Sequence, residues 1–161
     1  MPRVVVNSTP LIVLSKIGHL DLLRKLYAEV YIPQAVFDEV TAKADSACAA
    51  LSTQLDWIHV CKIRNEAERR MYQAKLHAGE VEVMILAQEP PRADLLVIDD
   101  NAAKKTAKFL GLTVTGTLGV ILKAKRLGYI ESASNVMEQL RMNGFYVSPE
   151  VLRLVKTAAE E

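Results

Sequence analysis

The chain has 161 residues, of which 50% are hydrophobic and 24% are charged, the balance of an ordinary globular protein. This length allows a substantial core, and we expect residues 1–161 to form a single domain. The 20 Lys and Arg residues nearly balance the 19 Asp and Glu residues, so affinity for nucleic acid needs a local basic patch. No apolar run is long enough to span a bilayer.

The cysteines and the first residues predict a reduced, cytoplasmic protein. Cys48 and Cys61 lie thirteen residues apart without a Cys-x-x-Cys pattern, and we expect both to be buried or partly buried small hydrophobic residues. The opening Val4-Val5-Val6 run stops at Asn7, which is too short for a secretory leader.

The first half of the chain alternates strand and helix patterns. The Val run is β-branched and apolar without alternation, as in a strand that is buried on both faces. Segment 43–54 is rich in Ala and Ser and predicts no definite element. The expected elements are a strand at 3–6, helices at 11–17 (capped by Ser8 or Thr9) and 20–27, a strand at 29–32 and a helix at 34–43.

The second half continues the alternation and predicts a three-layer α/β/α sandwich with a mainly parallel sheet. The segment 80–87 is almost wholly apolar after its first turn, so we expect a buried helix there. The other expected elements are strands at 57–60, 95–98 and 112–115, and helices at 65–76, 102–110, 117–126, 134–143 and 149–159, the last capped by Ser148.

The core strand 95–98 halts on Asp99-Asp100-Asn101, directly before a helical pattern that stops at Gly111. In open α/β sheets, ligands bind at the carboxyl ends of the strands. One of these three residues is enough to cap the helix. The other two polar residues are then not needed for capping, which favours a functional role for the acids. The alternative is that they serve only as the cap.

Oxygen ligands also occur near three other strand ends or helix starts: Asn7 follows the first strand, Glu39 lies one or two turns into the helix after the second, and Glu80 begins the buried helix. Together with Asp99 and Asp100 they predict a site for Mg²⁺ or Mn²⁺, because clustered carboxylates need a cation and hard cations prefer oxygen. Such a site suits phosphodiester hydrolysis. Each residue also has a structural interpretation: Asn7 in a turn, Glu39 as a solvated helix residue, and Glu80 at a helix N-terminus.

Other charged side chains are assigned by their position along the predicted helices. Lys104 and Lys105 follow the acids closely and are candidates for binding phosphate, with a solvated face shared with Lys108 as the alternative. Asp38 and Glu82 point away from their acidic neighbours on a helical wheel, so we expect them at the surface. Further basic residues either extend a basic rim around the candidate site or are ordinary surface charges: Arg69, Arg70, Lys123, Lys125 and Arg126.

Other chemistries lack their motifs. There is no Gly-x-Gly-x-x-Gly or Walker-type loop for a nucleotide cofactor, and no nucleophile elbow. The three His residues show no zinc-like spacing. A phosphate-accepting receiver domain would place its acid pair after the first strand, whereas this pair comes late.

Four stretches in order resemble the PIN-domain family. They are VVVNSTPLIVLSKIG at 4–18, YIPQAVFDEV at 31–40, LHAGEVEVMILA at 76–87 and VIDDNAAKKTA at 97–107. The continuation Gly-Leu-x-Val-x-Gly-Thr-Leu-Gly at 111–119 is similar to a subgroup of uncharacterised PIN proteins. The resemblance implies an α/β/α metal-dependent ribonuclease, and many bacterial members are toxins that are held inactive by an antitoxin.

The resemblance also implies roles for single residues. It carries the family's second acid to Glu39, the third to Glu80 and the fourth to Asp99 or Asp100, with Ser8 as a supporting hydroxyl. The family's first Asp is Asn7 here. An amide oxygen can bind a hard cation but carries no charge and accepts no proton, which predicts weaker metal binding.

The sequence therefore predicts a Mg²⁺- or Mn²⁺-dependent endoribonuclease, with RNA steered by Lys104 and Lys105. The setting implied by the resemblance is a toxin-antitoxin pair. Several small PIN proteins are dimers, and the apolar helices at 11–27 are candidates for a homodimer face. The alternative is a PIN-like nucleic-acid-binding protein that has lost catalysis through Asn7.

Overall fold

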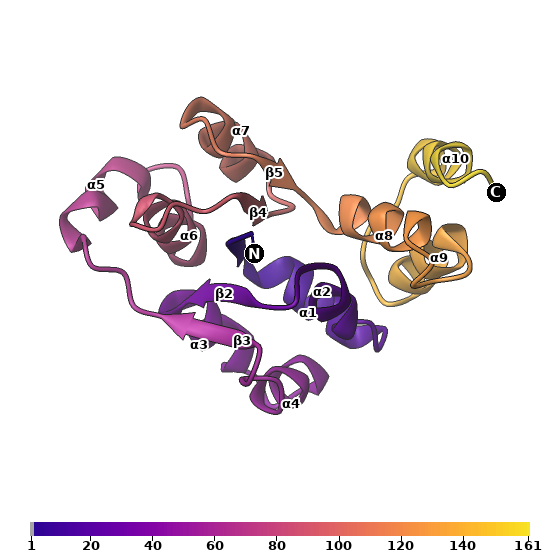
Figure 1. Cartoon of the computed structure of the whole chain (residues 1–161), viewed down its shortest axis with the longest axis horizontal. Helices are drawn as coiled ribbons and strands as arrows, with labels where there is room; N and C mark the ends of the chain where they lie inside the picture. Colours follow the sequence, from indigo (N-terminus) through magenta and orange to yellow (C-terminus); the bar gives the residue numbers. More distant parts are fainter. Residues whose placement is uncertain (1) are drawn as a thin grey trace.

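The computed structural model describes residues 2–161 and contains, within them, a five-stranded sheet (Figure 1). All strands pair in parallel, in the order β3-β2-β1-β4-β5. This confirms the predicted α/β class with a parallel sheet. The strands are β1 (Val4–Val6), β2 (Val30–Pro33), β3 (Ile58–Cys61), β4 (Leu95–Val97) and β5 (Val114–Thr115).

Helices pack around this sheet and complete the predicted three-layer arrangement. α6 packs against β1, β2 and α3, whereas α2 packs against β2 and α8. Within residues 2–161, none of the helices has the length and apolarity that a membrane crossing requires. The helices are α1 (Ser8–Lys16), α2 (Asp21–Tyr27), α3 (Gln34–Thr41), α4 (Ser46–Ser52), the 3-10 helix η1 (Glu66–Glu68), α5 (Arg69–Tyr72), α6 (Ala78–Gln88), α7 (Asn101–Phe109), α8 (Thr117–Arg126), α9 (Ala133–Met142) and α10 (Pro149–Ala158).

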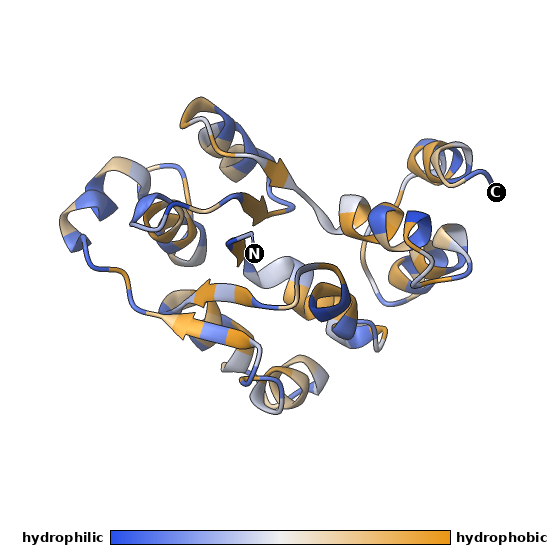
Figure 2. Ribbon diagram, viewed as in Figure 1, coloured by the Kyte–Doolittle hydropathy of each residue, from blue (hydrophilic) through white to orange (hydrophobic). Residues whose placement is uncertain are grey.

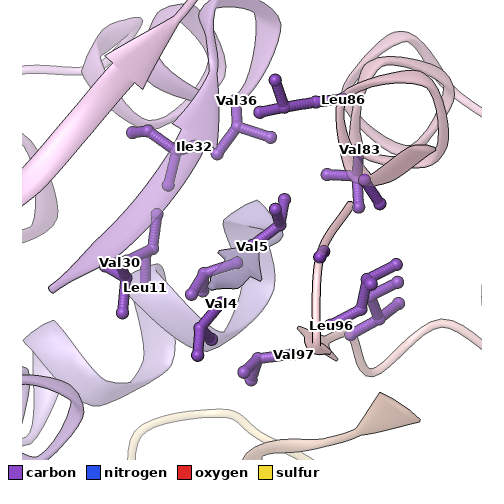
Figure 3. Close-up of a cluster of buried hydrophobic side chains, with 14 of the residues drawn as sticks. Val4, Val5, Leu11, Val30, Ile32, Val36, Val83, Leu86, Leu96 and Val97 are labelled. Atoms are coloured by element: carbon purple, nitrogen blue, oxygen red, sulfur yellow. The ribbon is translucent and has the colours of Figure 1, made fainter. Parts of the chain in front are cut away.

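The main core lies between the central strands and the helices α1, α3 and α6. Val5 of β1 is fully buried and pairs with Tyr31 of β2 on one side and with Leu96 of β4 on the other. Figure 3 shows Val83 and Leu86 of α6 near Val5 and Val36. Burial on both faces explains why β1 is an uninterrupted Val run rather than an alternating strand.

A second apolar cluster joins α8, α9 and α10, which lie to one side of the sheet (Figure 1). Val136, Met137 and Leu140 of α9 are buried there beside Ile121 of α8. Figure 2 shows hydrophobic and hydrophilic residues interspersed on these helices. α8 also contributes Val120 to the main core, so one helix connects both clusters.

Two segments differ from the expected elements. The unplaced segment 43–54 contains α4, whose N-terminus is capped by Asp45 accepting a hydrogen bond from the Cys48 N–H at 3.1 Å. The expected helix at 65–76 is wrong in part, because only η1 and α5 form and the chain then turns. Tyr72 and Leu76 are both buried, so the core contacts expected of this segment form although the helix does not continue.

Candidate functional site

The carboxyl ends of β1 and β4 lie at the point where the order of the strands reverses. The chain runs from β1 to β2 and β3 on one side and then places β4 on the other side of β1. Ligands of open α/β sheets bind at such a switch point. Asn7 follows β1 and donates its backbone N–H to the Val97 carbonyl oxygen at 3.0 Å. Asp99 follows β4, so both residues stand at the same edge.

Asn7 and Glu39 border one small space beside Gly79. A Cβ atom added to Gly79 would lie 3.3 Å from Glu39 Oε1 and 3.6 Å from Asn7 Oδ1. Gly79 is buried at the start of α6, and α3 carries Glu39 to it because the two helices pack together. Asn7 is only 3% exposed, whereas Glu39 is exposed. The pair therefore joins one buried amide oxygen to one carboxylate that solvent reaches.

The side chain of Asn7 takes no part in capping α1. Asn7 occupies the N-cap position, yet its side chain makes no capping hydrogen bond. The expected cap by Ser8 or Thr9 is wrong, because the first helical residue is Ser8 itself. Ser8 is buried, and its hydroxyl donates to Asn7 Oδ1 at 3.4 Å. The supporting role expected for Ser8 stays a prediction.

Thr117 holds both carboxylate oxygens of Asp99. Its backbone N–H donates to Asp99 Oδ1 at 2.8 Å, and its hydroxyl donates to Asp99 Oδ2 at 2.6 Å. Thr117 is the first residue of α8 and is fully buried. Sequence reasoning missed this residue. The available signal was its place at a helix start directly after a strand, where the backbone N–H groups of the first turn are free.

Gly116 leaves the space in which Asp99 and Lys104 come together. A Cβ atom at Gly116 would lie 2.7 Å from Asp99 Oδ1 and 3.2 Å from Lys104 Nζ. The first distance is shorter than real Cβ contacts, so a side chain at Gly116 would displace the carboxylate. Lys104 is partly buried here, whereas Lys105 is exposed. Of the two lysines expected to bind phosphate, Lys104 is the one beside the acid.

Asp100 and Glu80 are both engaged at helix ends. Asp100 is the N-cap of α7 and accepts the Ala103 N–H at 2.8 Å, so this acid does cap the helix. Glu80 accepts the His77 N–H at 2.9 Å in a capping box at the start of α6. Each carboxylate satisfies a backbone donor of the first helical turn, and sharing it with a ligand would weaken that bond.

Glu82 is not the surface charge that the helical wheel predicts. Its side chain is 8% exposed, accepts the Ala35 N–H at 3.0 Å and is paired with Arg69. Hydrogen bonds from Arg69 to Glu66 and Glu82 raise the pKa of the guanidinium. The wheel failed because α3 packs against this side of α6. Asp38 is exposed, as expected.

The donor chemistry of this edge fits a hard divalent cation. Carboxylate and amide oxygens are the ligands that Mg²⁺ and Mn²⁺ prefer, and the oxygens of Asn7 and Glu39 border the same space. Asp99 retains lone pairs beyond its two bonds to Thr117, because each carboxylate oxygen accepts about two hydrogen bonds. Within residues 2–161, no group of three or more His, Cys, Asp or Glu side chains is arranged to hold a metal.

Comparison with known proteins agrees with the fold. A family model described as a PIN domain matches residues 3–161, which is nearly the whole chain. A search of curated proteins found no match.

Proposed function

Because the chain belongs to the PIN-domain family, whose fold is of the nuclease type, we propose that it is a Mg²⁺- or Mn²⁺-dependent endoribonuclease. The observation that supports the proposal is the adjacency of the Asn7 and Glu39 oxygens at the switch point of the sheet. Asn7 and Glu39 adjoin across Gly79, and Asp99 follows the strand next to Asn7. A phosphodiester is the substrate for which a cation at such a site is most useful.

In this proposal Asn7, Glu39 and Asp99 hold the metal. Glu80 and Asp100 contribute once they release or share their capping bonds to His77 and Ala103. When bound, the cation lowers the pKa of a ligated water and offsets negative charge that develops on the phosphate.

The remaining residues orient these groups and the substrate. Ser8 fixes the amide of Asn7 and Thr117 fixes the carboxylate of Asp99. Lys104 brings a positive charge close to Asp99, where it attracts a phosphate of the RNA backbone. Glu39 is exposed, so its carboxylate is free to orient an attacking water.

The test is cleavage of an unstructured RNA by the purified protein with Mn²⁺, with Mg²⁺ and with chelator. We expect cleavage with either metal, none with chelator, and a loss of at least about a hundredfold in Asp99→Asn, since this change removes a ligand charge. Glu138→Gln, in an exposed ion pair on α9, is the matched control and should keep full activity. Cleavage that persists in chelator or in Asp99→Asn would contradict the proposal.

A second candidate function is RNA binding without catalysis. It is favoured by the neutral Asn7 at the buried end of β1 and by the internal hydrogen bonds of Glu80 and Asp100. This alternative predicts no cleavage by the natural protein and a gain of metal-dependent cleavage in Asn7→Asp. Cleavage by the natural protein would instead favour the nuclease, with Asn7 as a tolerated ligand.

We further propose that the protein acts as the toxin of a toxin-antitoxin pair and forms a homodimer. Support for both comes from membership of the PIN-domain family. Leu11, Leu14, Leu22 and Leu23 of α1 and α2 are buried within the chain, so these side chains are not free to form a dimer face. Growth arrest on expression, relieved by the product of an adjacent short reading frame, tests the toxin role.

A further inference from the structure

A pocket outside the proposed metal site lies between the α5 region and α7. It has a volume of about 310 Å³, near the lower end of the range for small-ligand pockets, about 300–1,000 Å³. In Figure 1 α7 lies across from α5 and α6. The lining side chains are mainly apolar and include Met71, Tyr72, Leu76, Phe109 and Leu110. We call this feature the α5-α7 groove.

Two large apolar side chains of the α5-α7 groove face solvent. Phe109 is 90% exposed and Met71 is 70% exposed. Tyr72 and Leu76, by contrast, are buried in the core and form the floor. Phe109 therefore presents an unpacked aromatic ring above an apolar floor, which is the arrangement that stacks a flat ring.

The charged side chain that lines the groove is the cation of Lys75. The segments 69–79 and 101–130, which include its walls, contain no Asp or Glu. Lys75 lines the groove, and Lys105 stands one helical turn before Phe109, on the same side of α7. Arg69 is already paired with acids. Within residues 2–161, neither Lys75 nor Lys105 forms an ion pair, so the two lysines favour an anionic occupant.

Helix α7 connects the groove to the proposed metal site. Lys104 lies beside Asp99 near the start of α7, and Phe109 lies at its end. Phe109 follows Lys104 by five residues, which places it about 7.5 Å farther along the helix axis and about 140° around it. Helix α7 therefore carries both the lysine beside Asp99 and the exposed ring of the groove.

We infer that the α5-α7 groove binds one unpaired base of a single-stranded RNA, with the base stacked on Phe109 and the flanking phosphates on Lys75 and Lys105. The inference rests on the proposed function only in taking RNA as the substrate. Stacking on aromatic side chains requires bases that are not paired, and it tolerates different sequences because every base has a flat face. The groove thus selects single strands.

The test measures binding in chelator, where the proposed cleavage cannot occur. A fluorescently labelled, unstructured RNA oligonucleotide is titrated with the natural protein, Phe109→Ala and Phe109→Trp. We expect Phe109→Ala to weaken binding about tenfold and Phe109→Trp to keep it, because stacking of one base on an aromatic ring contributes at about this level. Phe109 is exposed, so its replacement should leave the melting temperature unchanged.

Controls separate the groove from general effects. Tyr146→Ala removes another aromatic ring, 85% exposed and between α9 and α10, and should bind like the natural protein. A duplex RNA should bind Phe109→Ala and the natural protein equally.

The inference is overturned if the natural protein does not bind the single strand or if Phe109→Ala binds it normally. It is also overturned if polyglutamate competes as well as RNA, or if the change only converts a dimer to a monomer. Absence of cleavage with metal would count against the nuclease alone.

Discussion

At the scale of single residues, the candidate site depends on small residues, Thr117 and Gly116, that position the carboxylate of Asp99. Thr117 holds Asp99 through its backbone N–H and its hydroxyl, and Gly116 leaves room for that carboxylate. Hydrogen bonds to a charged group contribute more than neutral ones, about 1.5–3 kcal/mol. Thr117 is therefore a positioning residue for Asp99.

Replacement of Thr117 tests this role. Thr117→Val keeps the shape and the backbone N–H but removes the hydroxyl, so Asp99 loses one of its two bonds. We expect cleavage to fall about tenfold to a hundredfold, with RNA binding in chelator unchanged. Thr117→Ser restores the hydroxyl and should recover most of the activity. If the Ser variant is as impaired as the Val variant, Thr117 acts through packing instead.

At the scale of secondary-structure elements, the helix that carries Glu39 is capped from another helix. The first residues of α3 have no capping side chain of their own, and Glu82 of α6 accepts the Ala35 N–H in their place. Arg69 then neutralises Glu82 and ties the α5 region to the same point. The buried carboxylate of Glu82 thus holds α3 against α6, the two helices that meet at Gly79.

Removal of this carboxylate should destabilise the protein. Glu82→Ala leaves the Ala35 N–H without its partner and Arg69 without one of its two carboxylates. We expect the free energy of unfolding to fall by about 1–3 kcal/mol. Glu138→Ala breaks an exposed pair with Arg141 and should cost at most about 1 kcal/mol. Urea denaturation compares the two variants, and equal losses would contradict a special role for Glu82.

At the scale of the whole molecule, the last helices are joined by one carboxylate. Glu161 accepts hydrogen bonds from the Ser134 N–H at 3.0 Å and the Ala133 N–H at 2.7 Å, at the start of α9. Lys125 of α8 lies 3.3 Å from the same carboxylate. Glu161 therefore connects the end of the chain to α8 and α9, around the second apolar cluster.

This contact predicts a dependence of stability on pH. Hydrogen bonds hold the pKa of Glu161 below its ordinary value of 4.5. The largest contribution comes from the Ser134 hydroxyl, and a smaller one comes from the Ser134 backbone N–H. A lowered pKa in the folded state adds stability above the ordinary value, and this stability is lost as the pH falls below it. We expect Glu161→Gln to lower the melting temperature at pH 7 more than at pH 3. An equal drop in melting temperature at pH 7 and pH 3 would contradict this role of Glu161.

The sequence alone determined the parallel α/β/α fold and the strand-end positions of Asn7 and Asp99. Most strands and helices follow from local periodicity and from turn residues, which are properties of neighbouring positions in the sequence; α4 and the turn after α5 are the exceptions. The four matching stretches also indicated the PIN-domain family, because each is a continuous run of residues that can be read along the chain. The roles expected for Glu39, Glu80, Asp99 and Asp100 in binding metal stay predictions.

Only the tertiary structure decided which partners the polar side chains have. The burial of Glu82, the hold of Thr117 on Asp99 and the attachment of Glu161 to α9 each join residues that are distant in the sequence. A helical wheel shows the direction of a side chain but not the element that packs against it. Contacts of this kind depend on how the elements assemble, because the free energy of a buried charge is set by the partner it meets there.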